Sequence, residues 1–328
     1  MIPWVEKYRP TKIDHIISHR EIVRTLKKFI QLKTLPHLLF FGPSGSGKTS
    51  TIICCGNEIY GSYYDCMILR LNASNERGIE TVRTKIKNFV SNRNSIFLPP
   101  ELRSIFKLVI LDEIDSMTVE AQGMLRQTIE KNSITTRFCL ICNDIDKINT
   151  ALQSRCAIFR FSPLDGENMK LKLLEICRSE NIKYQNDAIE AIVNISHGDL
   201  RLAINILQHL NLTVGKTITI ENVYRVSGYC LPKLNHKLFQ VLSSLYAGEI
   251  SLEKCVEKIV KKITDHNITI YNLLENFKDD VLNSNFTTNQ KIYLLDNMAH
   301  IEVYDAVNMD PTNIIMNLAS LFVLVKNI

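Results

Sequence analysis

The chain lacks the features that mark several classes of protein. No run of about 18 apolar residues occurs in its 328 residues, so no membrane-spanning helix is expected. Residues 1–7 contain no long apolar stretch of the kind that a signal peptide has. Internal repeats and low-complexity segments are missing, and the net charge of +5 is spread along the chain. We therefore expect a globular intracellular protein of the cytosol or nucleus, for which nucleic-acid binding is permitted but not required.

The cysteines predict neither disulfides nor a zinc site. They are nine, an odd number, and lie scattered through apolar segments, as reduced core thiols usually do. Cys139 and Cys142 have C-x-x-C spacing, but no second ligand pair follows at zinc-site spacing. Strand alternation would place these two thiols on opposite faces. The neighbours Cys54 and Cys55 diverge by about 100° on a helix, so core packing is expected for both pairs.

The order of apolar runs predicts the fold class of the first half. The chain is too long for one ordinary core, and its 45% of apolar residues is typical of globular proteins. Apolar, β-rich runs occur at 37–41, 67–71, 106–111, 137–142 and 157–161, with helical patterns between them. This alternation predicts an α/β domain with a parallel sheet that binds its ligand at the carboxyl ends of the strands. After Pro163, amphipathic helical patterns dominate.

A phosphate-binding loop follows the first of these runs. Its residues are Gly42, Pro43, Ser44, Gly45, Ser46, Gly47, Lys48 and Thr49. The preceding apolar run and the following helical pattern are the context that this motif requires. Glycines let the backbone amides turn toward phosphate oxygens, and the helix N-terminus adds partial positive charge. Lys48 is expected to reach the β- and γ-phosphates and Thr49 to coordinate Mg²⁺, so the chain is predicted to bind a nucleoside triphosphate.

A second catalytic element ends the run at 106–111. The apolar residues 108–111 lead into Asp112 and Glu113, which places two carboxylates at the tip of a buried strand. We expect Asp112 to hold the magnesium ion and Glu113 to polarise the attacking water. Alone, such a run is a weak signal, because many buried strands end in a carboxylate. Its combination with the phosphate loop makes the catalytic interpretation the better one.

Further blocks make the chain resemble a known family. They are residues 3–10, residues 71–79, Cys142-Asn143, residues 154–156 and residues 198–201. With the phosphate loop and residues 111–113, these blocks resemble, in the same order, the motifs of the replication factor C small subunits, the AAA+ clamp loaders of eukaryotic and archaeal replication. The resemblance covers residues 1 to about 210. Beyond about residue 230, only the length and the helical pattern of the chain are compatible with this family.

The resemblance implies an architecture and partners. It implies an AAA+ nucleotide-binding α/β domain at 1–162, a helical lid domain at 163–226 and a helical C-terminal collar domain at 227–328. ATP and Mg²⁺ would be the cofactors. Partners would be one large and several related small subunits, a PCNA-type sliding clamp and primer-template DNA in the nucleus, with no membrane involved.

The resemblance also implies roles for single residues. Nucleotide contacts would come from Val5, Tyr8, Arg9, Pro10, Gly42, Pro43, Ser44, Gly45, Ser46, Gly47, Lys48, Thr49, Ser50, Asn143 and Arg201. Lys48, Glu113 and Asn143 would be catalytic in this chain's own site. Asn143 would orient the attacking water, and Arg201 would couple the lid to the γ-phosphate. For both, an ordinary surface position is the alternative. Ser44 and Ser46 stand where the family more often has Pro and Thr.

Arg155 is the most consequential residue of the resemblance. In this family the arginine acts in trans, so Arg155 would stabilise charge at the neighbouring subunit's site. We expect it to project from the domain edge without a partner in its own chain. This arrangement predicts weak ATPase activity for the isolated chain.

DNA and clamp contacts are placed only by analogy. Arg83 and Lys87 lie at i and i+4 of a predicted helix that tracks duplex backbone in the family, and a solvated helix face explains them equally well. The apolar residues 96–98, in a predicted loop at 92–104, would dock on the clamp.

Two alternative functions remain open. One is a scaffold subunit that binds ATP without hydrolysing it. The other is a related AAA+ DNA motor such as a branch-migration helicase. A winged DNA-binding domain at the C-terminus would support that alternative.

Overall fold

The computed structural model describes residues 2–74, 79–91, 105–215, 217–266, 268–306 and 310–327, with backbone alone at 79–83, 304–306 and 327. Two compact units divide the chain. The first comprises Met1–Ser179 and Ser196–Asn205, and the second comprises Glu180–Ile195 and Ile206–Ile328. The predicted boundaries after residues 162 and 226 stay predictions. Among the described helices, none is both long and apolar enough to span a membrane.

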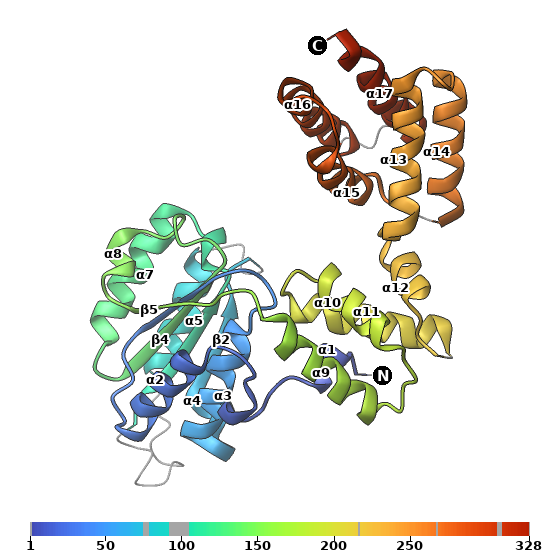
Figure 1. Cartoon of the computed structure of the whole chain (residues 1–328). Coiled ribbons are helices and arrows are strands. Elements are labelled where there is room, and N and C mark those ends of the chain that lie inside the picture. Colours follow the sequence, from blue (N-terminus) through green and yellow to red (C-terminus); the bar gives the residue numbers. More distant parts are fainter. Residues whose placement is uncertain are drawn as a thin grey trace. The chain divides into compact units, whose positions relative to one another are not determined.

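A five-stranded sheet lies at the centre of the first unit (Figure 1). Its order is β2 (Ile68–Asn72), β3 (Lys107–Asp112), β4 (Thr136–Cys142), β1 (Leu38–Phe41) and β5 (Ala157–Arg160). All the pairings are parallel. The five predicted runs therefore form the five strands, and the parallel α/β prediction is confirmed. Apolar runs suit these strands because both faces of a parallel sheet are covered.

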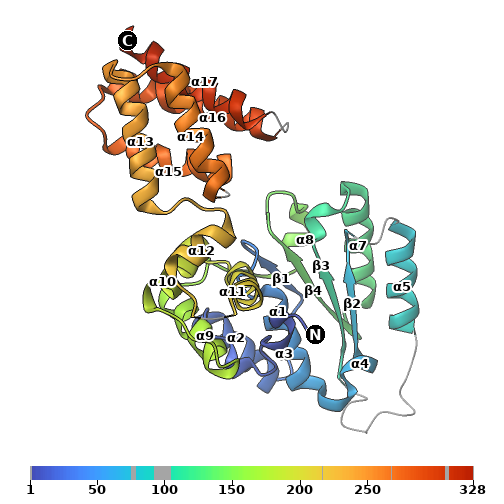
Figure 2. The same cartoon turned by 90° about the vertical axis from the view of Figure 1, so that its right-hand side faces the viewer.

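Two apolar clusters cover the two faces of the sheet. The first contains Leu38, Phe40 and Cys139, with α2 (Arg20–Gln31) and α3 (Lys48–Tyr60) packed on them. The second contains Leu39, Leu140 and Cys142, with α5 (Ile79–Ser91), α7 (Val119–Asn132) and α8 (Thr150–Gln153) packed on them. Figure 2 shows α5 and α7 on one side of the sheet and α3 on the other. Cys139 and Cys142 thus face opposite sides, as strand alternation predicts.

Short elements and one longer helix complete the first unit. They are α1 (Trp4–Lys7), α4 (Tyr64–Met67), α9 (Gly166–Ser179) and the 3-10 turns Ile13–His15, Gly61–Tyr63 and Ile114–Ser116. All nine cysteines are free, and within the described parts of the chain no group of three metal-binding side chains occurs. The sequence prediction of reduced core thiols holds for seven buried cysteines, whereas Cys66 is exposed and Cys156 is half-buried.

The second unit is helical, as the pattern after Pro163 predicts. Its helices are α10 (Asn186–Ile195), α12 (Ile220–Ser227), α13 (Pro232–Ala247), α14 (Leu252–His266), α15 (Ile270–Asn283), α16 (Thr288–Ala306) and α17 (Pro311–Leu324), followed by the 3-10 turn Val325–Asn327. Helix α11 (Leu200–Val214) begins in the first unit and ends in the second. Leu242, Phe277 and Phe322 are fully buried in the core that α13 to α17 share.

Candidate functional site

The phosphate loop connects β1 to α3, and its glycines are required by backbone geometry. Gly42, Gly45 and Gly47 have φ angles of 144°, 62° and 97°. A Cβ atom on Gly42 would lie 2.0 Å from the Phe161 carbonyl oxygen, and one on Gly45 would lie 1.8 Å from Asp199 Oδ1. Glycine is therefore needed at these two positions for conformation and for space.

We expect Gly45→Ala to weaken ATP binding more than tenfold and to destabilise the fold by about 1–3 kcal/mol, the range for strained backbone. The Cβ would displace the Asp199 carboxylate and deform the loop whose amides are predicted to bind the phosphates. Gly61→Ala is the matched control, because φ is 52° there and no atom lies within 4 Å of the new Cβ. Nucleotide titration and thermal unfolding measure both effects. Because both positions have positive φ, both variants should lose stability, and only Gly45→Ala should lose ATP affinity. An equal loss of ATP affinity in the two variants would contradict this interpretation.

Lys48 is buried at the start of α3 and folds back on its own loop. Its Nζ donates hydrogen bonds to Gly42 O at 2.6 Å, Pro43 O at 2.8 Å and Asn143 Oδ1 at 3.0 Å. Burial lowers the pKa of Lys48, while the nearby Asp112 carboxylate acts to raise it. The ammonium group is thus held by neutral acceptors at the place where the motif expects phosphate oxygens.

The two predicted magnesium ligands contact each other. Thr49 Oγ1 donates to Asp112 Oδ2 at 2.9 Å, which brings a hydroxyl from α3 beside a carboxylate from β3. Oxygen donors of this kind suit Mg²⁺, which usually takes one or two carboxylates and completes its shell with phosphates and water. The residues present therefore fit the ion. Glu113 follows with φ of 56°, is exposed, and lines the same cavity.

Asn143 lies at the end of β4 and is held by an aspartate that sequence reasoning missed. Asp115 Oδ2 accepts hydrogen bonds from the backbone N–H of Asn143 at 3.0 Å and of Asp144 at 3.3 Å. This leaves the Asn143 side chain to contact Lys48. Asp115 is the last residue of the acidic motif that begins at Asp112, and its place next to the predicted catalytic pair was the available signal.

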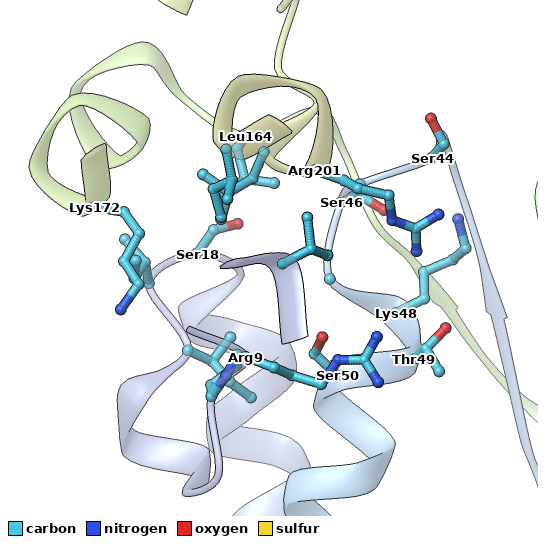
Figure 3. A pocket seen from close by; sticks show the side chains of 18 of the residues that line it. Arg9, Ser18, Ser44, Ser46, Lys48, Thr49, Ser50, Leu164, Lys172 and Arg201 are labelled. Atoms are coloured by element: carbon cyan, nitrogen blue, oxygen red, sulfur yellow. The ribbon is translucent and has the colours of Figure 1, made fainter. Parts of the chain in front are cut away.

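A single cavity brings most of the predicted nucleotide contacts together (Figure 3). It is lined by Val5, Tyr8, Arg9, Pro10, Ser44, Gly45, Ser46, Gly47, Lys48, Thr49, Ser50, Asp112, Glu113, Asn143 and Arg201. Gly42 and Pro43 do not line it but hold Lys48 through their carbonyls. In Figure 3 the charged ends of Lys48 and Arg201 lie close together on the loop side of the cavity. Their proximity agrees with the lowering effect of Arg201 on the pKa of Lys48.

Several lining residues were not predicted from sequence. They are His15, Ile16, Ile17, Ser18, His19, Leu164, Lys172, Leu200 and Ile204. His19 contacts the loop directly, with Nε2 at 3.2 Å from Ser46 O and its ring packed against Phe161. Burial lowers the pKa of His19, which favours the neutral ring. For residues 15–19, the only sequence signal was their position shortly after the block at residues 3–10.

Asp199 joins the phosphate loop to the start of α11. Its Oδ2 accepts a hydrogen bond from Ser44 Oγ at 2.6 Å, and its Oδ1 accepts from Leu202 N at 3.0 Å. A proline at position 44 could not make this hydrogen bond, because it has no hydroxyl group. Asp199 directly precedes α11, so its carboxylate contacts both the phosphate loop and the first turn of the helix that carries Arg201.

The prediction that Arg155 has no partner within the chain is wrong. Arg155 is exposed and lies outside the cavity, as expected, but its Nη2 forms an ion pair with Glu130 Oε1 at 2.5 Å. Its Nη1 also donates to Ala151 O at 2.7 Å. Helices α7 and α8 pack on the same face of the sheet, and this packing brings Glu130 beside Arg155.

The predicted DNA and clamp contacts lie away from the cavity or outside the described residues. Lys87 is exposed on α5. Arg83 lies on the same helix, but its side chain is outside the described part of the structure. Residues 96–98 are also outside it.

Comparisons with known proteins agree with the geometry. A family model described as "ATPase family associated with various cellular activities (AAA)" matches residues 38–164, and one described as "RCF1/5-like, AAA+ ATPase lid domain" matches residues 172–212. Among solved structures, the Holliday junction branch migration motor RuvB of Thermotoga maritima has a TM-score of 0.53 at 18% identity, covering 76% of this chain and 85% of that one. That likeness shows the shared fold.

Proteins with similar sequences identify the family more narrowly than the family models and solved structures do. An Acanthamoeba polyphaga mimivirus protein described as a replication factor C small subunit is 65% identical over the whole chain and 95% of its own length. Human replication factor C subunit 5 is 42% identical over 92% of this chain and 85% of its own. Human subunit 4 is 41% identical over 92% and 82%. The chain therefore belongs to the replication factor C small-subunit family of AAA+ ATPases.

Proposed function

We propose that this protein is an ATPase subunit of a hetero-oligomeric clamp loader, which opens a PCNA-type sliding clamp and loads it onto primer-template DNA in replication and repair. The observation that carries the proposal is one cavity that joins Lys48, the Thr49–Asp112 pair, Glu113 and Asn143 in a chain of this family. A subunit that only bound ATP as a scaffold would not need Glu113 and Asn143 at this cavity.

In the proposed reaction, this chain's residues bind ATP and position a water. The loop amides and Lys48 hold the phosphates, and Glu113 polarises the water that attacks the γ-phosphate. Asn143, whose backbone N–H donates to Asp115, orients that water. Arg201 contacts the γ-phosphate and so couples the position of α11 to the bound nucleotide. Thr49 and Asp112 would hold Mg²⁺, which neutralises charge on the phosphates when bound.

The partners follow from the family. They are one large and several related small subunits, the clamp and primer-template DNA. Lys87 and Arg83 of α5 would contact DNA backbone without reading sequence, and residues 96–98 would dock on the clamp. Action at sites of DNA replication is the expectation, and the nucleus stays a prediction because the relative at 65% identity is viral.

Activity in the assembly tests this proposal. We expect the isolated chain to hydrolyse ATP slowly, because its site lacks an arginine from a neighbour, and turnover to rise about 10³-fold when partner subunits, clamp and primed DNA are added. Clamp retained on circular primed DNA after gel filtration is the second measurement.

Two outcomes would favour the alternatives. ATP bound in the assembly without turnover at this chain's site would indicate a scaffold subunit. Rapid hydrolysis by the isolated chain, insensitive to clamp and primed DNA but driving movement of branched DNA, would indicate a branch-migration motor.

A further inference from the structure

Three oxygen atoms of the chain hold the guanidinium group of Arg155. Glu130 Oε1 lies 2.5 Å from Nη2, Ala151 O accepts from Nη1 at 2.7 Å, and Ser154 Oγ lies 3.3 Å from Nη1. Within the described residues, Nε of Arg155 makes no hydrogen bond. The group is therefore oriented by its own chain while part of its five-donor set stays available to another acceptor.

Glu130 comes from a helix that is fixed to the sheet. Its neighbour Ile129 is 1% exposed and Leu125 is 5% exposed, so the inner face of α7 is buried in the core. The Glu130 carboxylate also lies 3.8 Å from Arg126 Nε, one turn earlier on α7. The Glu130 carboxylate thus lies between the guanidinium groups of Arg155 and Arg126, on a helix whose place is set by its packing on the sheet.

The ion pair contributes little to the stability of the fold. The Arg155 and Glu130 side chains are 36% and 40% exposed, and exposed ion pairs are typically worth about 0–1 kcal/mol. In the Arg126–Glu130 pair the arginine precedes the glutamate, which is the less favourable order on a helix. The effect of Glu130 is therefore expected to be on the orientation of Arg155 rather than on folding.

Orientation matters because a free arginine side chain is mobile. Arginine carries about 2 kcal/mol of rotamer entropy, which is lost when the group is ordered on a phosphate. A side chain already ordered by its own chain loses less of it in the transition state. An acceptor at a fixed place beside Nη2 supplies that order.

We propose that Glu130 is the positioning residue of Arg155, holding Nη2 so that the remaining N–H donors meet the γ-phosphate bound by the neighbouring subunit. This inference rests on the in-trans role of Arg155 in the proposed function. Glu130 is not a catalytic residue, because in this arrangement it touches Arg155 and no reacting atom.

Two substitutions separate the contribution of the acceptor oxygen from that of its negative charge. Glu130→Gln keeps an oxygen that can accept from Arg155 and removes the negative charge, whereas Glu130→Ala removes both. We expect Glu130→Ala to lower kcat at the neighbouring subunit's site about tenfold with KM unchanged within twofold. Glu130→Gln should retain at least half of kcat. The control is Glu120→Ala, an exposed glutamate of the same helix, which should behave as wild type.

The first measurement uses the isolated chain. A dicarbonyl reagent that modifies arginine, followed by peptide mass spectrometry, reports how accessible the Arg155 guanidinium is. Modification of Arg155 should become severalfold faster in Glu130→Ala and stay unchanged in Glu120→Ala. An unchanged rate in Glu130→Ala would overturn the proposal, because it would mean that Glu130 does not hold the arginine.

The second measurement is single-site ATP turnover in the assembly, with Arg155→Ala as a reference. If Arg155→Ala lowers turnover at the neighbouring site and Glu130→Ala does not, the positioning role is wrong while the in-trans role stands. If Glu130→Ala raises turnover, Glu130 restrains the arginine and the proposal is also wrong. If Arg155→Ala has no effect at that site, the in-trans role fails and the positioning role fails with it.

Discussion

Replacement of Lys48 by alanine should lower the affinity of the isolated chain for ATP at least about 100-fold. The ammonium group is the one cationic side chain of the phosphate loop, and truncating one partner of a buried, hydrogen-bonded charge pair costs about 2–5 kcal/mol. In the structure Nζ is already directed to the loop by Gly42 O and Pro43 O, so little rearrangement is needed to meet a phosphate. Titration with a fluorescent ATP analogue measures the loss.

Lys28→Ala is the matched control for Lys48→Ala. Lys28 is an exposed lysine of α2 that does not line the cavity. Its substitution should leave ATP affinity within twofold of wild type. Thermal unfolding of both variants shows whether the fold is kept. Unchanged ATP affinity in a folded Lys48→Ala protein would contradict the assignment of the phosphate loop.

Arg155→Ala should reduce ATP turnover at the adjoining subunit on the order of 10³-fold and leave this chain's own ATP affinity within twofold. Arg155 lies outside the cavity that holds Lys48 and Arg201, so its loss removes no contact from that site. At an interface, its charge would stabilise the negative charge that develops on the neighbour's γ-phosphate. Clamp loading by the assembly should fall in parallel.

Mixed assemblies identify the affected site. Each subunit's phosphate-loop lysine is replaced in turn, so that the remaining turnover reports the other sites one by one. Arg178→Ala, at an exposed position of α9, is the control and should have no effect. A deficit confined to this chain's own site would show that Arg155 does not act in trans.

The features that could be predicted from the sequence depend on residues that are close together along the chain. The phosphate loop is eight contiguous residues, and its flanking strand and helix follow from apolar patterning with periods of 2 and 3.6. For the same reason the five strands were found within one or two residues, and the carboxylates at the tip of β3 were recognised. Periodicity also placed Cys139 and Cys142 on opposite faces, because neighbouring positions in a strand alternate.

Contacts between distant segments were decided only by the tertiary structure. Asp199 lies against Ser44 although 155 positions separate them, because α11 begins beside the phosphate loop. Asp115 holds the backbone of Asn143 because β3 and β4 are neighbours in the sheet. The partner of Arg155 was missed for a similar reason. An exposed arginine in a sequence has many possible acidic partners, and only the packing of α7 and α8 on one face of the sheet selects Glu130.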